Sequence, residues 1–287
     1  MTDKNITGFF LDTCILLPQG LEADKNACEK ILNGEVGFFV SKSVKDEAAQ
    51  LFNESCNVLS TGLRHYIKPA FERKGVTRVT RNDATVVAEV FSQEKRRIDK
   101  EYPVGRSNIR RNMFGSIENY VASLMHNLDV DKYLSITDLL AAALIMLEHA
   151  RCEVEKPFKT VCTVPVEVDE KLLSFEPICG LVKNVKDVRH LMAAVQYQFK
   201  FDTWVIFVTN DEKDILSNAE EIWRFCGLRC VKPCWAFDYR RDMTRFNRPR
   251  QYFGEDCILS KELRAFIKII ESVLQVSIRS DVFEQNK

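Results

Sequence analysis

The sequence has 287 residues, enough to bury the core of one large domain or of one domain with a substantial insertion. Its apolar fraction of 46% and charged fraction of 29% are ordinary for a soluble globular protein, and its 41 basic and 41 acidic residues cancel, so net charge favours no particular partner. The N-terminus lacks the features of a signal peptide, and no segment offers the roughly 18 apolar residues of a membrane span. We therefore expect a soluble, cytoplasmic protein that does not bind membranes.

The N-terminal part of the chain alternates between strand and helix patterns. Residues 8–11 (GFFL) form a short apolar run that ends in Asp12, and residues 36–40 (VGFFV) form a second run; both are typical of buried strands. Residues 24–32 and 43–52 have helical spacing, and the second helix opens on the capping-box pattern SVKD. This order of strand, helix, strand and helix predicts a parallel sheet.

The middle of the chain breaks this alternation. Residues 84–100, 114–126 and 137–150 have long helical patterns. Residues 159–168 (KTVCTVPVEV) are β-like, and Pro165 favours an edge strand or a loop there.

The alternation then resumes as helix 185–199, strand 204–208 (WVIFV), helix 215–225, strand 228–231 and helix 260–274. The simplest architecture is an α/β fold in which a parallel sheet flanked by helices is interrupted by a large, mostly helical insertion. The predicted parts are a core of residues 1–60 and 180–240, an insertion of residues 61–179 that is basic in its first half, and an Arg-rich segment with a C-terminal helix over residues 241–287.

Four acidic residues lie where a parallel sheet gathers its ligands. Asp12 directly follows the first strand and Asp211 follows the third, and open parallel sheets bind ligands at the carboxyl ends of their strands. Glu47 and Asp187 lie on or beside the buried stripe of their helices, where an unpaired charge is costly. Each has an ordinary explanation as a cap, a turn residue or an ion-pair partner. Together they favour a shared Mg²⁺ or Mn²⁺ site, because oxygen ligands without His or Cys suit these ions.

The same residues resemble the motifs of the PIN-domain nuclease family. LDTCILL contains Asp12, SVKDEAAQLF contains Glu47, DVRHLMAAV opens on Asp187, and WVIFVTND contains Thr209 and Asp211, in the order of that family. The resemblance covers about a third of the chain, on either side of the helical middle. It implies a PIN-like fold and a metal-dependent nuclease site in which the four acids are catalytic residues and metal ligands.

Neighbouring polar residues extend this hypothesis. Asp214 lies one helical turn from Asp211 and is a candidate accessory ligand. Thr13, Thr209 and Asn210 are candidates for orienting the carboxylates through hydrogen bonds, although local backbone bonding explains the two threonines equally well.

Three other residues have simpler structural explanations. Asp138, in ITDLLAAALIML, resembles the Asp187 motif, but no strand with a T-x-D motif follows it at a suitable distance, so we interpret it as a helix-start residue. Asp46 is interpreted as a helix cap and His190 as a helix-packing residue.

Positive charge is concentrated in two parts of the chain. From Thr61 to Asn112 there are 13 Lys and Arg residues against 6 Asp and Glu residues, and an arginine cluster near the end is interleaved with Tyr239, Phe246 and Tyr252. Arginine mixed with aromatic residues suits single-stranded nucleic acid, whose bases stack, although a solvated face explains each cluster equally well. The candidate nucleic-acid-binding residues are Arg64, Lys68, Arg73, Lys74, Lys95, Arg96, Arg97, Arg240, Arg241 and Arg245.

The ten cysteines do not predict a zinc site. Cys226, Cys230 and Cys234 are spaced four apart, but the chain contains no CxxC pair and no His lies near them. Single thiols with mostly apolar neighbours are typical of reduced core residues in a cytosolic protein.

These features predict an Mg²⁺- or Mn²⁺-dependent endoribonuclease, with single-stranded RNA as the substrate that the family resemblance implies. A non-catalytic PIN-like scaffold that binds RNA or a protein partner is one alternative, and the toxin of a toxin–antitoxin pair is another. A haloacid-dehalogenase-type phosphatase is a third, but Cys14 stands where that family has its second Asp. The sequence is also compatible with a homo-oligomer.

Overall fold

The structure consists of two compact units. The computed structural model describes residues 6–16, 22–32, 37–101, 107–160, 162–164, 168–243, 245–246, 248–255 and 260–275. Unit 1 consists of residues 1–48 and 160–287, and unit 2 of residues 49–159. The second unit therefore begins and ends earlier in the chain than the predicted insertion, and the C-terminal segment belongs to unit 1.

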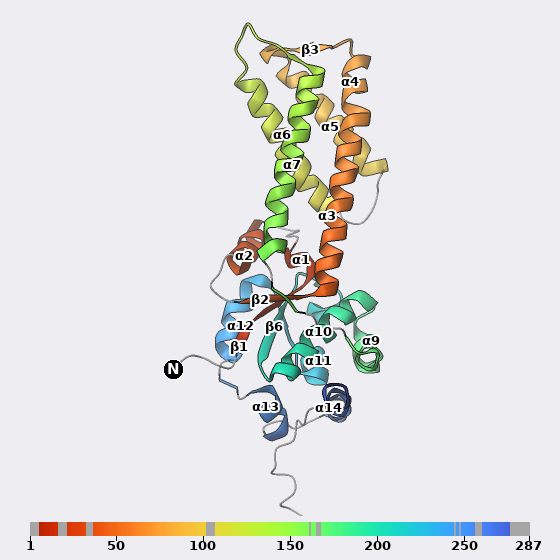
Figure 1. Cartoon of the computed structure of the whole chain (residues 1–287), viewed down its shortest axis with the longest axis vertical. Helices are drawn as coiled ribbons and strands as arrows, with labels where there is room; N and C mark the ends of the chain where they lie inside the picture. The colour runs from red at the N-terminus through yellow and green to blue at the C-terminus, as the bar shows by residue number, and fades with distance from the viewer. Residues whose placement is uncertain are drawn as a thin grey trace, which may run out of the picture. The chain divides into compact units, whose positions relative to one another are not determined.

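Unit 1 is built on a five-stranded parallel sheet, of which Figure 1 labels β1, β2 and β6. The strand order is β5-β2-β1-β6-β7, and all neighbours are parallel. The strands are β1 (Ile6–Leu11), β2 (Phe38–Ser41), β5 (Cys162–Val164), β6 (Trp204–Val208) and β7 (Arg229–Val231). The predicted fold class, an α/β fold with a parallel sheet flanked by helices, is confirmed at this level.

Continuous apolar runs explain why the central strands are buried on both faces. Every residue of β6 is buried, as are the last three of β1. In a parallel sheet covered by helices on both faces, strands typically consist of such continuous apolar runs. Phe10 pairs with Phe207 in register, and their rings stack at a centroid distance of 6.4 Å. Leu11 lies opposite Val208, which in turn lies opposite Val231, so β1, β6 and β7 end at the same level.

Helices connect and cover these strands. They are α1 (Thr13–Leu16), α2 (Glu22–Leu32), α8 (Glu170–Leu173), α9 (Glu176–Leu181), α10 (Val185–Phe201), α11 (Ala219–Cys226), α12 (Ala236–Met243), α13 (Pro249–Glu255) and α14 (Lys261–Leu274), with 3₁₀ turns η3 (Leu216–Asn218) and η4 (Pro233–Trp235). Helix α3 (Lys42–Gly62) begins in unit 1 and continues in unit 2. Within the described residues, no helix is both long and apolar enough to cross a membrane.

Helix α10 is enclosed by other elements. Asn184 caps its first turn by accepting a hydrogen bond from the amide of Lys186 at 3.1 Å. The run from Leu191 to Val195 is buried without interruption, which is typical of a helix covered on all sides. This packing fixes the first turn of α10, which carries Asp187, relative to the sheet.

The start of α3 differs from the prediction. Ser41 Oγ accepts a hydrogen bond from the amide of Val44 at 3.2 Å, so Ser41 caps the helix. The predicted cap at Ser43 and the interpretation of Asp46 as a cap were therefore wrong, because the strand ends and the helix begins before both residues. Ser43 is already inside the helix, and its hydroxyl lies 2.9 Å from that of Ser41.

An aromatic cluster attaches the C-terminal segment to the sheet. The ring of Trp204 lies 5.5–5.6 Å from those of Trp223, Tyr252 and Phe253. Arg250 donates two side-chain hydrogen bonds of 2.9 Å to backbone carbonyls at the end of α10. These contacts explain why α13 belongs to unit 1.

Unit 2 is mostly helical. It contains the remainder of α3, the π-helical turn η1 (Leu63–Ile67), α4 (Lys68–Arg73), η2 (Arg81–Asp83), α5 (Ala84–Glu101), α6 (Ser107–His126) and α7 (Ile136–Thr160), with an antiparallel pair of β3 (Arg78–Val79) and β4 (Leu134–Ser135). Pro69 has no amide proton to bond the carbonyl of His65, which explains the wider turn between α3 and α4.

Candidate metal centre

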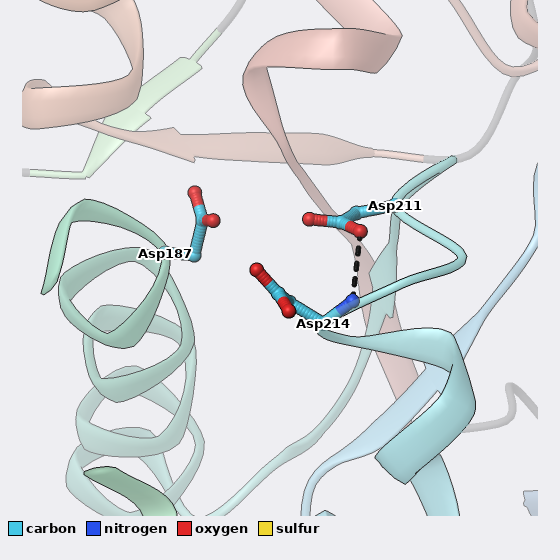
Figure 2. A group of neighbouring side chains, drawn as sticks. All are labelled: Asp187, Asp211 and Asp214. Carbon is cyan, nitrogen blue, oxygen red and sulfur yellow. Dashed lines mark hydrogen bonds between the residues drawn. The ribbon is translucent and has the colours of Figure 1, made fainter. Parts of the chain in front are cut away.

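Three aspartates converge in unit 1. Figure 2 shows Asp187, from the first turn of α10, facing Asp211 and Asp214, from the loop after β6. Each offers a carboxylate oxygen, and these oxygens lie within 4.8 Å of one another. In the described part of the chain, this is the one group of three or more His, Cys, Asp or Glu residues that could hold a metal ion. A set of carboxylate oxygens alone suits Mg²⁺ or Mn²⁺.

Local hydrogen bonds hold the loop after β6. Asp211 Oδ1 accepts hydrogen bonds from the amides of Lys213 and Asp214 at 3.0 Å each, and the second bond is drawn in Figure 2. The hydroxyl of Thr209 accepts a hydrogen bond from the amide of Asp211 at 3.0 Å. The short polar side chains of the TND sequence thus turn the chain so that both carboxylates face α10.

Asp12 lies beside this group at the carboxyl end of β1. It is 6% exposed, and its carboxylate accepts hydrogen bonds from the amide of Thr13 and the hydroxyl of Thr209 at 2.7 Å each. Cys14 Sγ also donates to it at 3.2 Å. Burial alone would raise the pKa of Asp12, but its contacts with His190, Thr209 and Cys14 outweigh burial and lower that pKa.

Glu47 is held by partners on two other helices, α1 and α10. Its Oε2 accepts a hydrogen bond from the hydroxyl of Thr13 at 2.9 Å, and its Oε1 lies 3.3 Å from Lys186 Nζ. Burial raises the pKa of Glu47, but Thr13, His190 and Lys186 together lower it. Glu47 therefore combines the predicted position on the buried stripe of α3 with the ordinary role of an ion-pair partner.

His190 lies between two of the predicted acids. It is 2% exposed, with Nδ1 3.4 Å from Asp12 Oδ1 and Nε2 3.8 Å from Glu47 Oε2. Interpreting this residue as helix packing missed its role in the site. The signal was present in the sequence, because His190 follows Asp187 by three residues and so shares its side of the helix.

The acids around Asp187 are crowded enough to change its protonation. Burial and the negative charge of Asp12 raise the pKa of Asp187, His190 lowers it, and Asp211 raises it again, to about 6. An acid whose charge is opposed by its neighbours gains from a nearby cation. This observation fits a divalent ion bound among these carboxylates.

The structure places the predicted site residues in two adjoining sets. Asp187 and Asp211 lie in the converging group, together with Asp214, the predicted accessory residue. Asp12 and Glu47 lie outside that group and are joined to each other through His190 and Thr13. Thr13 and Thr209 bond the carboxylates directly, while the amide of Asn210 donates to Cys14 Sγ at 3.1 Å.

Most predicted nucleic-acid-binding residues of unit 2 are paired with glutamates. Arg73 and Arg97 pair with the buried Glu94, and the pairs of Lys68, Lys74 and Lys95 are with Glu72, Glu89 and Glu118. Arg64 and Arg96 are exposed. Part of the basic excess in this segment therefore neutralises acids of the same unit.

The predicted aromatic–arginine cluster near the C-terminus is largely structural. Phe246 and Tyr252 pack against Trp204 at centroid distances of 6.4 and 5.5 Å. Arg241 pairs with Asp238 at 3.5 Å, Arg240 is half-buried and Arg245 is exposed. Two of the three aromatic residues in this cluster thus pack against unit 1, whereas Tyr239 is exposed.

Two other predictions concern residues outside the site. Asp138 lies in the first turn of α7, where its amide and carboxylate bond the hydroxyl of Ser135 at 3.1 and 2.6 Å, as expected for a helix-start residue. Cys226 and Cys230 are buried, and burial raises the pKa of Cys226 to about 12. Cys234 is exposed.

Comparison of the chain with protein-family models, with curated proteins and with solved structures found no match.

Proposed function

We propose that this protein is a metal-dependent nuclease with a PIN-like core, which hydrolyses phosphodiester bonds in single-stranded RNA with Mg²⁺ or Mn²⁺. The observation that carries the proposal is the convergence of Asp187, Asp211 and Asp214 beside the buried Asp12. These residues follow the ends of β1 and β6 or open α10, where open parallel sheets bind their ligands.

Each residue has a role in this proposal. Asp187, Asp211 and Asp214 would hold the ion, and Asp12 would hold it from the adjoining set. A bound ion of this kind supplies an activated water for attack on phosphorus and neutralises charge on the phosphate. Thr209 and His190 position the Asp12 carboxylate, as outer partners of metal ligands do.

The proposal is tested by cleavage of a labelled single-stranded RNA. The wild type should cleave it with Mn²⁺ or Mg²⁺ but not with a chelator. Asp12→Asn and Asp187→Asn should each lower the rate more than about 100-fold, because losing an outer partner alone typically costs 10–100-fold. Asp138→Asn is the matched control, since Asp138 is an exposed acid in a similar sequence, and it should leave the rate unchanged.

Two outcomes would contradict the proposal. Cleavage that survives both the chelator and Asp12→Asn would mean that another site, or a contaminating enzyme, performs the reaction. RNA binding without cleavage under any divalent ion would favour the non-catalytic scaffold instead.

A further inference from the structure

The structure leaves two aromatic side chains exposed on the segment that follows β7. Trp235 is 56% exposed and Tyr239 is 37% exposed. They are four residues apart across the junction of η4 and α12, so they lie on the same side of that element. We call this surface, with the adjacent Arg229, the Trp235–Tyr239 face.

This face does not take part in the packing of α12 on the sheet. Ala236 is buried, and the ring of Phe237 meets that of Phe9 on β1 edge-on at 5.2 Å. The sheet therefore engages the side of α12 that carries Phe237. Trp235 and Tyr239 are not needed to hold this helix in place, and aromatic side chains this exposed often serve recognition.

The strand register places the start of this face at the carboxyl edge of the sheet, the edge that also carries the acids. Val231, the last residue of β7, pairs with Val208, the last of β6, and η4 begins two residues later. Adjacent strands lie about 4.8 Å apart, so the ends of β7 and β1 are separated by about 10 Å. Lys232, between β7 and η4, forms an ion pair with Glu212, the neighbour of Asp211.

Positively charged side chains lie beside this face and around the acids. The guanidinium of Arg229 lies over the Trp223 ring at 4.3 Å and 6.0 Å from the Tyr239 ring, and it also pairs with Glu220 at 3.0 Å. On the other side of the acids, exposed lysines lie at the start of α3, around the start of α10 and in the loop after β6: Lys42, Lys183, Lys186 and Lys213. A phosphate chain bound at the acids would therefore have lysines around it.

We infer that the Trp235–Tyr239 face stacks the unpaired bases of a single-stranded nucleic acid whose backbone crosses the acidic group. Aromatic platforms beside cationic groups bind single strands with little sequence preference, because every base has a π-face. A duplex hides these faces, so the inference also predicts selection against paired substrates. It rests on the proposed nuclease function for its choice of ligand, and it adds the residues that would recognise the strand.

The test measures binding separately from cleavage. A fluorescent oligouridylate and an oligothymidylate are titrated at low salt in the presence of a chelator, and anisotropy gives the Kd. Trp235→Ala and Tyr239→Ala should each weaken binding of both strands about 10-fold, and Trp235→Phe should retain most of the affinity. An abasic strand of the same length should bind the wild type as weakly as the normal strand binds Trp235→Ala.

Phe201→Ala is the matched control. Phe201 is an aromatic residue with a similar exposure of 54%, but it ends α10 just before β6 and so lies at the amino edge of the sheet. Its loss should not change the Kd. Trp235 and Phe201 are both more than half exposed, so neither side chain belongs to the buried core, although the Phe201 ring contacts Tyr197 at 4.6 Å.

Three results would overturn the inference. They are unchanged binding by Trp235→Ala and Tyr239→Ala, equal affinity of the wild type for abasic and normal strands, and no binding by the wild type. A change from dimer to monomer on Trp235→Ala, seen by sedimentation, would instead assign the face to a second copy of this chain. Trp235-dependent binding without any metal-dependent cleavage would reject the nuclease proposal and leave the face as a nucleic-acid site.

Discussion

Asp187 is the residue that shows most clearly how grouping the acids destabilises the metal-free protein. Its pKa is about 6, above the ordinary 3.8, because it is partly buried next to Asp12 and Asp211. The folded protein therefore binds more protons than the unfolded chain between these two pH values. The contribution of Asp187 to the free energy of unfolding is therefore lost as pH rises through this window, and the loss is complete above about pH 6.

Asp187→Asn should therefore stabilise the metal-free protein at neutral pH. The expected gain is about 1 kcal/mol, less than the full pKa shift implies because Asp187 is only partly buried. The variant should also lose the rise in melting temperature that Mn²⁺ gives the wild type. Thermal unfolding at pH 5 and pH 7.5, with and without Mn²⁺, measures both effects, and a variant less stable than the wild type at pH 7.5 without metal would contradict this explanation.

Thr209 connects the two sets of acids through one hydroxyl. It donates to Asp12 at 2.7 Å and accepts from the amide of Asp211 at 3.0 Å. Thr209→Val keeps the shape of the side chain but removes both hydrogen bonds of the hydroxyl, so Mn²⁺ affinity and the cleavage rate should fall about 10–100-fold. Thr209→Ser retains the hydroxyl and should stay close to the wild type. Equal Mn²⁺ affinity of the Val and Ser variants, measured by calorimetry, would mean that the hydroxyl does not position the acids.

At the scale of elements, the end of α11 determines how β7 enters the sheet. Gly227 ends this helix with a φ of +67°, and an added Cβ would collide with the ring of Phe253 on α13. A side chain at this position would therefore strain the backbone and clash with the aromatic cluster. The same residue fixes the start of β7, whose carboxyl end leads to Trp235.

Gly227→Ala should lower the free energy of unfolding by at least about 1–2 kcal/mol, the cost of a left-handed conformation for a residue with a side chain. Gly180→Ala is the matched control, because Gly180 lies in α9 and a Cβ there meets nothing within 4 Å. That substitution should leave stability unchanged or raise it. Urea unfolding of the two variants compares them directly, and equal stabilities would argue against the described contact with Phe253.

The sequence predicted most elements because their signals are local. The strand over Trp204–Val208 matched its predicted range, since an uninterrupted apolar run is required where both faces of a strand are buried. Asp12 and Asp211 were found as candidates for the same reason, because they follow such runs. The cap at Ser41 was missed because the capping-box pattern begins at Ser43, and only the end of β2 shows that the helix starts earlier.

Features that depend on packing could not be predicted in this way. Phe246 and Tyr252 read as exposed stacking residues, yet they belong to the cluster around Trp204, formed by segments far apart in the chain. Trp235 lies in a short 3₁₀ turn with no periodicity to indicate its exposure. The contact of His190 with Asp12 and Glu47 likewise requires β1, α3 and α10 to be assembled.

At the scale of the whole molecule, all the acids of the candidate site belong to unit 1. Binding of Mn²⁺ should therefore slow hydrogen exchange in the loop after β6, in the first turn of α10 and at the end of β1. Exchange in α5 and α6 of unit 2 should not change. Asp187→Asn should abolish the protection, and protection confined to unit 2 would place the metal elsewhere.

Anomalous scattering from manganese in crystals soaked with Mn²⁺ would locate the metal site directly. We expect a peak among the carboxylates of Asp187, Asp211 and Asp214, on the side of Asp12, and no such peak in Asp187→Asn crystals. A wild-type structure with these four carboxylates ordered and no manganese among them, or with manganese bound only at other residues, would contradict this expectation.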